Sequence, residues 1–339
     1  MSVKVGINGF GRIGRMIATT AHSDPKCPVE IVAVNDPGAP ETLLHLLKYD
    51  SVHGAIDAEA RLTKKGFSLD DHEILLSQES DPSKINWKKF GVDIVLECTG
   101  AFRKRKDSEV HLKQGAKYVI VSAPSPDADV TLCVGINQEK FNPKSHRIVS
   151  NASCTTNCIA PVAKLLHDNF GIYRGMMTTI HSYTLDQRLL DANHSDLRRA
   201  RAAALSMIPT TTGATQAVEQ VIPELKGRLT GISVRVPTAN VSLVDFTASL
   251  EKNAKVNQVN KIFKDAATGE MSNILGFTEE PLVSVDFNGC PQSAIIDASL
   301  TQSCGDRLVK VFAWYDNETG FSYRMLDLAL FMGTKAELV

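Results

Sequence analysis

A cysteine at position 154 has the sequence surroundings of a reactive thiol. It lies in the polar run 150–158, directly before the helix-like segment 159–166. A cysteine in the first turn of a helix meets the positive end of the helix dipole, which lowers its pKa, and backbone N–H groups that can hold an oxyanion. The pattern also fits a small buried cysteine whose neighbours Ser153 and Thr155 cap a helix. Cys154 is therefore a candidate nucleophile that needs a base.

His181 is the candidate base. It ends the apolar, strand-like run 175–181, from which its side chain could project into a cleft. A cysteine and a histidine in different elements match the pattern of nucleophile plus base. A hydrogen-bonded structural histidine is the alternative. Two arginines could bind a phosphate: Arg199 lies in a polar loop and Arg235 within a strand-like run. Arginine suits this role because it can contact a phosphate through two hydrogen bonds. A loop arginine such as Arg199 also fits a solvated surface.

A glycine-rich motif near the N-terminus indicates a dinucleotide site. Gly9, Gly11 and Gly14 form the pattern G-x-G-x-x-G between a strand-like run and a helix-like run, and Asp36 follows Gly14 by 22 positions. The glycines let the backbone approach a pyrophosphate at a helix N-terminus, and the acid binds ribose hydroxyls. An acid at this position also repels a 2′-phosphate, so the motif favours NAD.

The elements that must position these residues fall into two sets. In the first half, short β-branched runs alternate with helix-like segments and predict a doubly wound parallel sheet over about residues 1–150. The strand-like runs there are 3–7, 31–34, 92–96, 118–121, 132–135 and 147–149. The second half has runs of period two, which predict an antiparallel sheet with helices on one side. These runs are 175–181, 231–236, 240–246, 282–287 and 308–314.

Composition narrows the classes of function. The 339 residues are 43% hydrophobic and 22% charged, with a net charge of -1, which fits a globular protein of two domains and argues against a polyanion as the main partner. The N-terminus runs straight into a strand-like segment, so we expect no secretion signal or membrane anchor. Seven scattered cysteines fit reduced thiols in the cytoplasm, and no Cys/His spacing suits a metal.

Together these residues resemble the phosphorylating glyceraldehyde-3-phosphate dehydrogenase family, over Lys4 to about Leu328. The matching segments are 7–15, 47–51, 150–158, 181–184, 196–203, 209–214, 235–238 and 314–318. The resemblance implies a Rossmann domain over 1–153 that binds NAD, with the C-terminal helix 319–333 docking back on it. It implies an α+β catalytic domain with a mostly antiparallel sheet over 154–318, and a homotetramer in which the loop 183–206 borders a neighbour's cofactor pocket.

The resemblance also assigns roles to single residues. It implies that Cys154 is the nucleophile and His181 its base, with glyceraldehyde 3-phosphate and inorganic phosphate as substrates. The residues implied for the two phosphates are Ser153, Thr155, Thr184, Arg199, Thr212, Gly213 and Arg235. The residues implied for the cofactor, beside the three glycines, are Arg12, Ile13, Asp36, Ser122 and Asn317.

Departures from the family pattern leave some questions open. Ser80 stands where many members have arginine, and Ala192-Asn193 where many NAD-specific members have Leu-Pro. The other marks of NADP-using members are absent, so we expect a preference for NAD with at most weak use of NADP. Two alternative functions stay open: an erythrose-4-phosphate dehydrogenase that passes its thioester to water, and a non-catalytic protein that senses NAD or binds nucleic acid.

Overall fold

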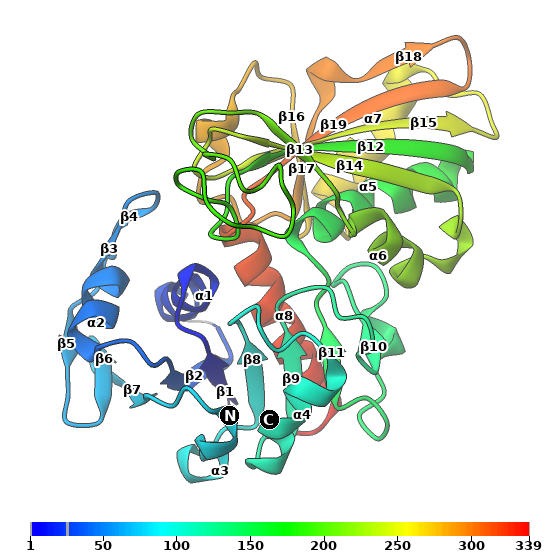
Figure 1. Ribbon diagram of the computed structural model, residues 1–339. Coiled ribbons are helices and arrows are strands. Elements are labelled where there is room, and N and C mark those ends of the chain that lie inside the picture. Colours follow the sequence, from blue (N-terminus) through cyan, green and yellow to red (C-terminus); the bar gives the residue numbers. More distant parts are fainter. Residues whose placement is uncertain (1, 25–26, 339) are drawn as a thin grey trace. The chain divides into compact units, whose positions relative to one another are not determined.

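The computed structural model describes residues 2–24 and 27–338, and their contacts divide into two units (Figure 1). The first unit runs to Val134, continues over Gln138–Ala152 and is completed by the chain from Ser322 on; the second holds Gly135–Asn137 and Ser153–Phe321. No helix among these described residues is long and apolar enough to cross a membrane.

A largely parallel sheet forms the centre of the first unit, with strand order β10-β11-β9-β8-β1-β2-β7-β6-β5. Strands from β10 to β7 run parallel, and β6 and β5 continue the sheet antiparallel. The bounds are β1 Val3–Asn8, β2 Val29–Asn35, β5 Ala60–Leu62, β6 Gly66–Leu69, β7 His72–Ser77, β8 Ile94–Glu97, β9 Tyr118–Val121, β10 Val130–Thr131 and β11 Ile148–Ser150. The inner strands are buried along most of their length, as their apolar runs predict.

Helices complete the first unit. They are α1 Arg12–Ser23, α2 Pro40–Lys48, α3 Trp87–Phe90, α4 Arg105–Lys113 and, from Ser322 on, α8 Thr319–Lys335. Short 3₁₀ turns lie at Pro82–Lys84 and Gln138–Lys140, and a small β3–β4 ladder joins Tyr49–Asp50 and Gly54–Ala55. Helix α8 buries Met325, Leu328 and Met332, and a Cβ at Gly333 would collide with Val3. The last helix of the chain therefore packs against its first strand.

The second unit is built on a sheet of order β13-β14-β12-β15-β19-β17-β16, with β18 paired to β19. Its bounds are β12 Ile172–Ser182, β13 Ile208–Thr210, β14 Leu229–Val236, β15 Ser242–Leu250, β16 Leu275–Thr278, β17 Ala294–Asp297, β18 Gln302–Cys304 and β19 Leu308–Tyr315. Most neighbours are antiparallel, and β12 with β14 and β16 with β17 are parallel. The predicted fold class, a Rossmann domain plus an α+β domain, is thus confirmed.

The helices of the second unit contact this sheet. They are α5 Cys154–Phe170, α6 Ala214–Val221 and α7 Val256–Thr268, with 3₁₀ turns at Pro223–Leu225, Ser284–Phe287 and Ala298–Leu300. Helix α5 contacts β12, β15, β17 and β19, α6 contacts β14, and α7 contacts β16. Eleven residues of α5 are buried, so this helix is held firmly at the sheet and its first residue, Cys154, is held with it.

Two predicted strands are wrong. Residues 284–287 form a 3₁₀ turn, because the Asp286 carboxylate accepts a hydrogen bond from Val283 N (2.8 Å) and closes a capped turn despite the alternating pattern. The strand expected at 132–135 lies two residues earlier, at β10. Gly135 has a positive φ of 84°, which ends the extended backbone there.

Candidate active site

The second unit brings Cys154 and His181 together. Cys154 is the first residue of α5, and its N-cap Ser153 accepts a hydrogen bond from Thr156 N (3.0 Å) through its hydroxyl oxygen. His181 is the penultimate residue of β12. The Cys154 Sγ lies 3.6 Å from His181 Nε2, within reach of a sulfur hydrogen bond. A helix start and a strand end therefore supply the thiol and the imidazole.

The hydrogen bonds of His181 determine which ring nitrogen carries the proton. Nδ1 lies 2.7 Å from the carbonyl oxygen of Ser182. Arg235 Nη1, which only donates, lies 3.1 Å from the same nitrogen, but the Ser182 carbonyl, which only accepts, is the closer group. We therefore place the proton on Nδ1, and the neutral ring then has a bare Nε2 facing Cys154. His181 is thus in the tautomer that can accept the thiol proton.

Arg235 lies beside His181 because of strand register. The two residues are direct partners in the parallel pair β12 and β14. Arg235 Nη1 donates to Ser182 O (3.1 Å) and Thr184 Oγ1 (3.3 Å) and lies 3.1 Å from His181 Nδ1. Its buried Nε makes no hydrogen bond to any described residue. Its hydrogen bonds among the described residues all go to neutral groups, so an added anion would meet a cation that no ion pair there has neutralised.

The structure corrects the expected pKa of Cys154. Burial raises the pKa of this thiol above its usual 9.0, although the positive charge of Arg235 and hydrogen bonds from Thr155 and from the Cys154 backbone act to lower it. The expectation of a lowered pKa was wrong because desolvation of the thiolate outweighs the helix-end effect. The resting sulfur is consequently a thiol rather than a thiolate.

His181 is shifted in the direction that suits a base. Burial lowers its pKa from 6.5 to about 3, with the nearby charges of Arg235 and Arg199 contributing and the hydrogen bond to Ser182 opposing. The ring is only 4% exposed. The raised pKa of the thiol and the lowered pKa of the imidazole both favour the neutral pair over an ion pair.

Tyr315 is a part of the site that the sequence analysis missed. Its buried hydroxyl lies 2.9 Å from both Thr155 Oγ1 and Thr179 Oγ1, and its ring meets His181 edge-on, with centroids 5.9 Å apart. The only signal was its position inside the motif 314–318. The Thr155 hydroxyl hydrogen-bonds to Tyr315, and the Ser153 hydroxyl to that of Thr156 (2.7 Å).

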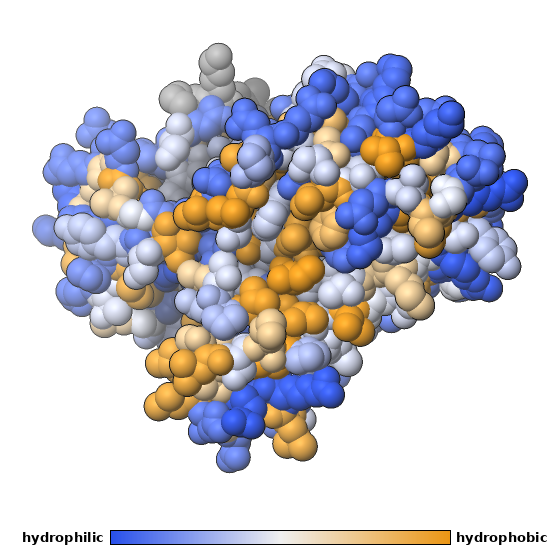
Figure 2. All heavy atoms as spheres, turned by 90° about the horizontal axis from the view of Figure 1, so that it is seen from above, coloured by the Kyte–Doolittle hydropathy of each residue, from blue (hydrophilic) through white to orange (hydrophobic). Residues whose placement is uncertain are grey.

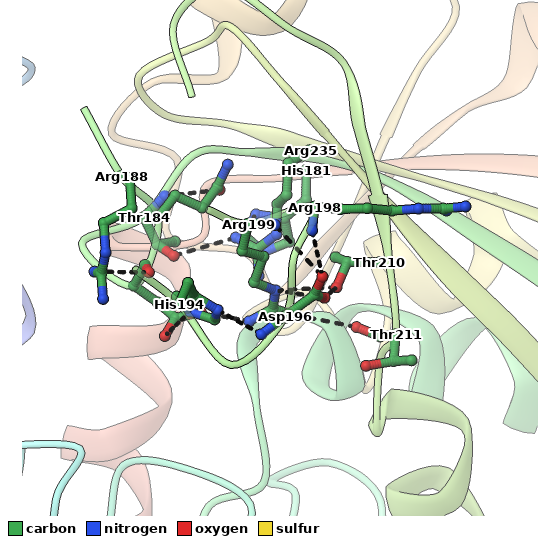
Figure 3. Close-up of polar contacts among 12 residues, drawn as sticks. His181, Thr184, Arg188, His194, Asp196, Arg198, Arg199, Thr210, Thr211 and Arg235 are labelled. Carbon is green, nitrogen blue, oxygen red and sulfur yellow. Dashed lines mark hydrogen bonds and ion pairs between the residues drawn. The ribbon is translucent and has the colours of Figure 1, made fainter. Parts of the chain in front are cut away.

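Arg199 differs from Arg235 in its partners. It forms an ion pair with Asp186, and its Nε lies 3.0 Å from Thr210 Oγ1 and 3.7 Å from an Asp196 oxygen. Figure 3 shows Arg199 beside Asp196 and Thr210, whereas Arg198 on the same loop extends away from them. Arg199 is therefore largely neutralised by the protein's own carboxylates.

The remaining predicted substrate residues lie at the start of α6. Gly213 is the N-cap of this helix, and a Cβ added there would meet open space. The Thr212 hydroxyl oxygen accepts a hydrogen bond from Ala214 N (3.2 Å). Exposed backbone N–H groups at a helix start suit an anion.

In the first unit the glycine-rich turn has the geometry that its glycines predict. Gly9 has a positive φ of 91°, and a Cβ there would lie 2.7 Å from Thr99 N. A Cβ at Gly14 would collide with Gly9 O, whereas a Cβ at Gly11, the N-cap of α1, would meet nothing within 4 Å. Two glycines thus allow tight packing and the third leaves open space above the helix N-terminus.

Comparison with known proteins places this geometry in a family. Residues 3–105 match the model of the glyceraldehyde 3-phosphate dehydrogenase NAD binding domain, and residues 153–317 match that of the C-terminal domain. The chain is 56% identical to glyceraldehyde-3-phosphate dehydrogenase of Geobacillus stearothermophilus over 335 residues, 99% of each chain. It is 54% identical to glyceraldehyde-3-phosphate dehydrogenase 1 of Bacillus cereus over 98% of this chain and 99% of the relative. The chain belongs to the glyceraldehyde-3-phosphate dehydrogenase family.

The NAD-binding domain of this glyceraldehyde-3-phosphate dehydrogenase family member fits its cofactor. Asp36 lies directly after β2, and its two carboxylate oxygens accept one backbone N–H each, from Phe10 and Gly38 (both 2.9 Å), which leaves lone pairs for ribose hydroxyls. Arg12 and Ile13 form the first turn of α1 above the open space at Gly11. Ser122 follows β9 and donates its backbone N–H to Glu97 O (3.0 Å).

Two predicted cofactor residues have partners of their own. Arg12 binds Asp50 in a bidentate pair (2.9 and 3.1 Å), and although burial opposes the shift, Arg12 and two backbone N–H groups lower the pKa of Asp50 to about 2. Asn317 belongs to the second unit, where its Oδ1 accepts from the hydroxyls of Ser182 (2.8 Å) and Ser242 (2.9 Å). The Asn317 amide oxygen is thus bonded within the protein, and the NH₂ group of the same side chain points away from the two serines.

Proposed function

We propose that this protein oxidises and phosphorylates D-glyceraldehyde 3-phosphate to 1,3-bisphosphoglycerate with NAD, through a thioester on Cys154. The observation that carries the proposal is the 3.6 Å contact between Cys154 Sγ and the bare Nε2 of His181. Family membership supports the substrate, since the relatives at up to 56% identity are named for it.

The first step follows from the resting protonation states. His181 Nε2 takes the thiol proton as Cys154 Sγ bonds to the aldehyde carbon, which yields a thiohemiacetal oxyanion. The imidazolium then transfers this proton from Nε2 to the oxyanion, which also accepts a hydrogen bond from the Cys154 backbone N–H. A thiohemiacetal hydroxyl and a neutral His181 result. Because His181 is neutral at rest, its Nε2 can accept the thiol proton when the carbon–sulfur bond forms.

The second step converts the thiohemiacetal to a thioester. Bound NAD supplies the acceptor for the hydride that leaves the former aldehyde carbon. His181 takes the hydroxyl proton as the carbonyl of the thioester forms. Inorganic phosphate then attacks the thioester carbon, the Cys154 sulfur leaves as thiolate, and an acyl phosphate is released.

The arginines and helix start suggest how two phosphates are accommodated. We assign Arg235 with Thr184 to the substrate phosphate and the start of α6, at Thr212 and Gly213, with Ser153 and Thr155, to inorganic phosphate. Arg235 supports this assignment because its hydrogen bonds to described residues all involve neutral groups. Arg199 would bind either phosphate by giving up its ion pair with Asp186.

One assay tests the reaction. NADH formation from glyceraldehyde 3-phosphate is measured with and without inorganic phosphate, for wild type, Cys154→Ser and the matched control Cys158→Ser. Cys158 lies one turn later and is fully buried, and its Sγ donates to Ala313 O (3.8 Å), a bond that a serine hydroxyl can also make. We expect phosphate-dependent activity in wild type and control and none in Cys154→Ser. If the wild-type rate did not depend on phosphate, this would contradict phosphorylation of the thioester and favour its hydrolysis. If wild type formed no NADH, this would contradict the proposal that the protein is a dehydrogenase.

We further propose that the protein is a homotetramer. The loop between β12 and β13 exposes Leu185, Leu189, Leu197 and Leu205, each 79–82% exposed. Figure 2 shows apolar side chains, in orange, on the surface that is seen from above. Apolar surface of this kind marks an interface, and sedimentation equilibrium gives the number of copies. The seven free thiols are in keeping with a cytoplasmic location.

A further inference from the structure

A row of buried polar side chains crosses the sheet of the first unit. Asn35, Asn8 and Glu97 are the last residues of the adjacent strands β2, β1 and β8, and Asn8 pairs in register with both of the others. All three are at most 3% exposed. The row therefore lies under the carboxyl edge of the sheet, immediately before the segments that we assign to the cofactor.

Hydrogen bonds join the row from end to end. Asn35 Nδ2 donates to Asn8 Oδ1 (2.8 Å), and Asn8 Nδ2 donates to Glu97 Oε2 (2.6 Å). His111 Nε2, from α4, lies 3.0 Å from the same Glu97 oxygen. Glu97 Oε1 accepts from the backbone N–H of Thr99 (2.8 Å) and from its hydroxyl.

Trp87 fixes the protonation states in this network. Its indole N–H donates to His111 Nδ1 (3.0 Å). An indole only donates, so Nδ1 is bare and the neutral ring carries its proton on Nε2, where it donates to Glu97. All the groups at the Glu97 carboxylate are then donors, two on each oxygen. A side chain that accepts hydrogen bonds from donors at both oxygens in this way is an ionised carboxylate.

The network sets the shape of the turn against which the glycine-rich loop packs. Glu97 holds Thr99 through both of its hydrogen bonds, and Thr99 N is the atom that a Cβ at Gly9 would meet first. Gly9 N donates to Asn35 O (2.9 Å) and Cys98 N to Asn8 O (2.7 Å), so the loop and the turn are both tied to the row.

We propose that Glu97 is a positioning residue for the dinucleotide: its carboxylate, oriented by His111, holds the turn 97–99 so that the loop from Gly9 is preformed for the pyrophosphate. The inference rests on the proposed use of NAD and adds residues that contact the loop rather than the cofactor. Preforming a binding loop raises affinity because less ordering remains to be done on binding.

Glu97→Gln tests the carboxylate with almost no change of volume. Whichever way the new amide turns, its NH₂ faces two donors, either those of Thr99 or those of Asn8 and His111, so the network must rearrange on one side or the other. We expect the NAD dissociation constant to rise about tenfold or more, with kcat at saturating NAD within about twofold of wild type and an unchanged KM for the aldehyde. Glu109→Gln, on the exposed side of α4, is the matched control.

A pair of changes at His111 separates the hydrogen bond from packing. Gln places an N–H donor near the position of Nε2, whereas Phe fills the space without a donor. We expect His111→Gln to keep NAD affinity within about threefold of wild type and His111→Phe to weaken it as Glu97→Gln does. If Glu97→Gln fails to fold, these two His111 variants still test whether the network supports NAD binding.

Calorimetric titration with NAD, together with steady-state KM and kcat, distinguishes the outcomes. Wild-type NAD affinity in folded Glu97→Gln, or equal affinities in the two His111 variants, would overturn the inference. A kcat loss equal to the affinity loss would also overturn it, because a merely structural role predicts that both fall together. Failure of wild type itself to bind NAD would instead contradict the proposed function.

Discussion

His111 and His181 are both buried and both neutral, yet they carry their protons on opposite nitrogens. His111 accepts at Nδ1 from Trp87 and donates at Nε2 to Glu97, so the protein uses both of its ring nitrogens. His181 donates at Nδ1 to a carbonyl and leaves Nε2 for a thiol. The difference shows that a histidine becomes available for proton transfer when one nitrogen has a fixed partner and the other faces a reactive group.

The largest effect expected from this contrast is on turnover. His181→Gln should lower kcat by about 10² to 10⁴, because general base catalysis typically contributes that much. The variant should still bind NAD. His146→Gln, in an exposed turn, is the control and should retain kcat. A wild-type kcat in His181→Gln would contradict the claim that His181, unlike His111, transfers a proton during the reaction.

Stability at acid pH sharpens the contrast. Folded His181 binds a proton near pH 3, whereas the unfolded chain binds it near 6.5. Between these values the unfolded state holds more protons, so the free energy of unfolding falls as the pH falls below 6.5. From pH 7 to 5 the loss amounts to about 2 kcal/mol at 1.36 kcal/mol per pH unit. Urea titrations at several pH values should show a correspondingly shallower acid slope in His181→Gln, and equal slopes would contradict the assignment.

The smallest effect concerns the charge beside the thiol. The Arg235 cation lowers the pKa of Cys154 against the effect of burial. Arg235→Gln should therefore raise that pKa, and a rise of one unit would slow iodoacetamide alkylation at pH 8 about tenfold. Arg198→Gln, whose side chain extends away from the site, should leave the rate unchanged. Faster alkylation in Arg235→Gln would show that its charge does not reach the sulfur.

The sequence predicted much of the fold because apolar periodicity and glycine spacing are local signals. The dinucleotide motif, the two sheet types and the family resemblance are confirmed. The strand expected at 282–287 was wrong because one side-chain cap at Asp286 outweighed an alternating pattern.

Features that depend on distant contacts could not be predicted. The raised pKa of Cys154 comes from burial among segments far apart in the chain. Tyr315 reaches Thr155 across 160 positions. The tautomers of His111 and His181 depend on which single atom lies opposite each nitrogen, and no sequence pattern records that.

Helix α8 has a consequence for the order of events during synthesis. The residues from Ser322 on complete the first unit, and Gly333 packs against Val3. A chain still attached to the ribosome therefore exposes the apolar surface around β1 until the residues of α8 have emerged. The catalytic unit, which ends at Phe321, is fully translated before the cofactor-binding unit receives its last helix, although that unit begins the chain.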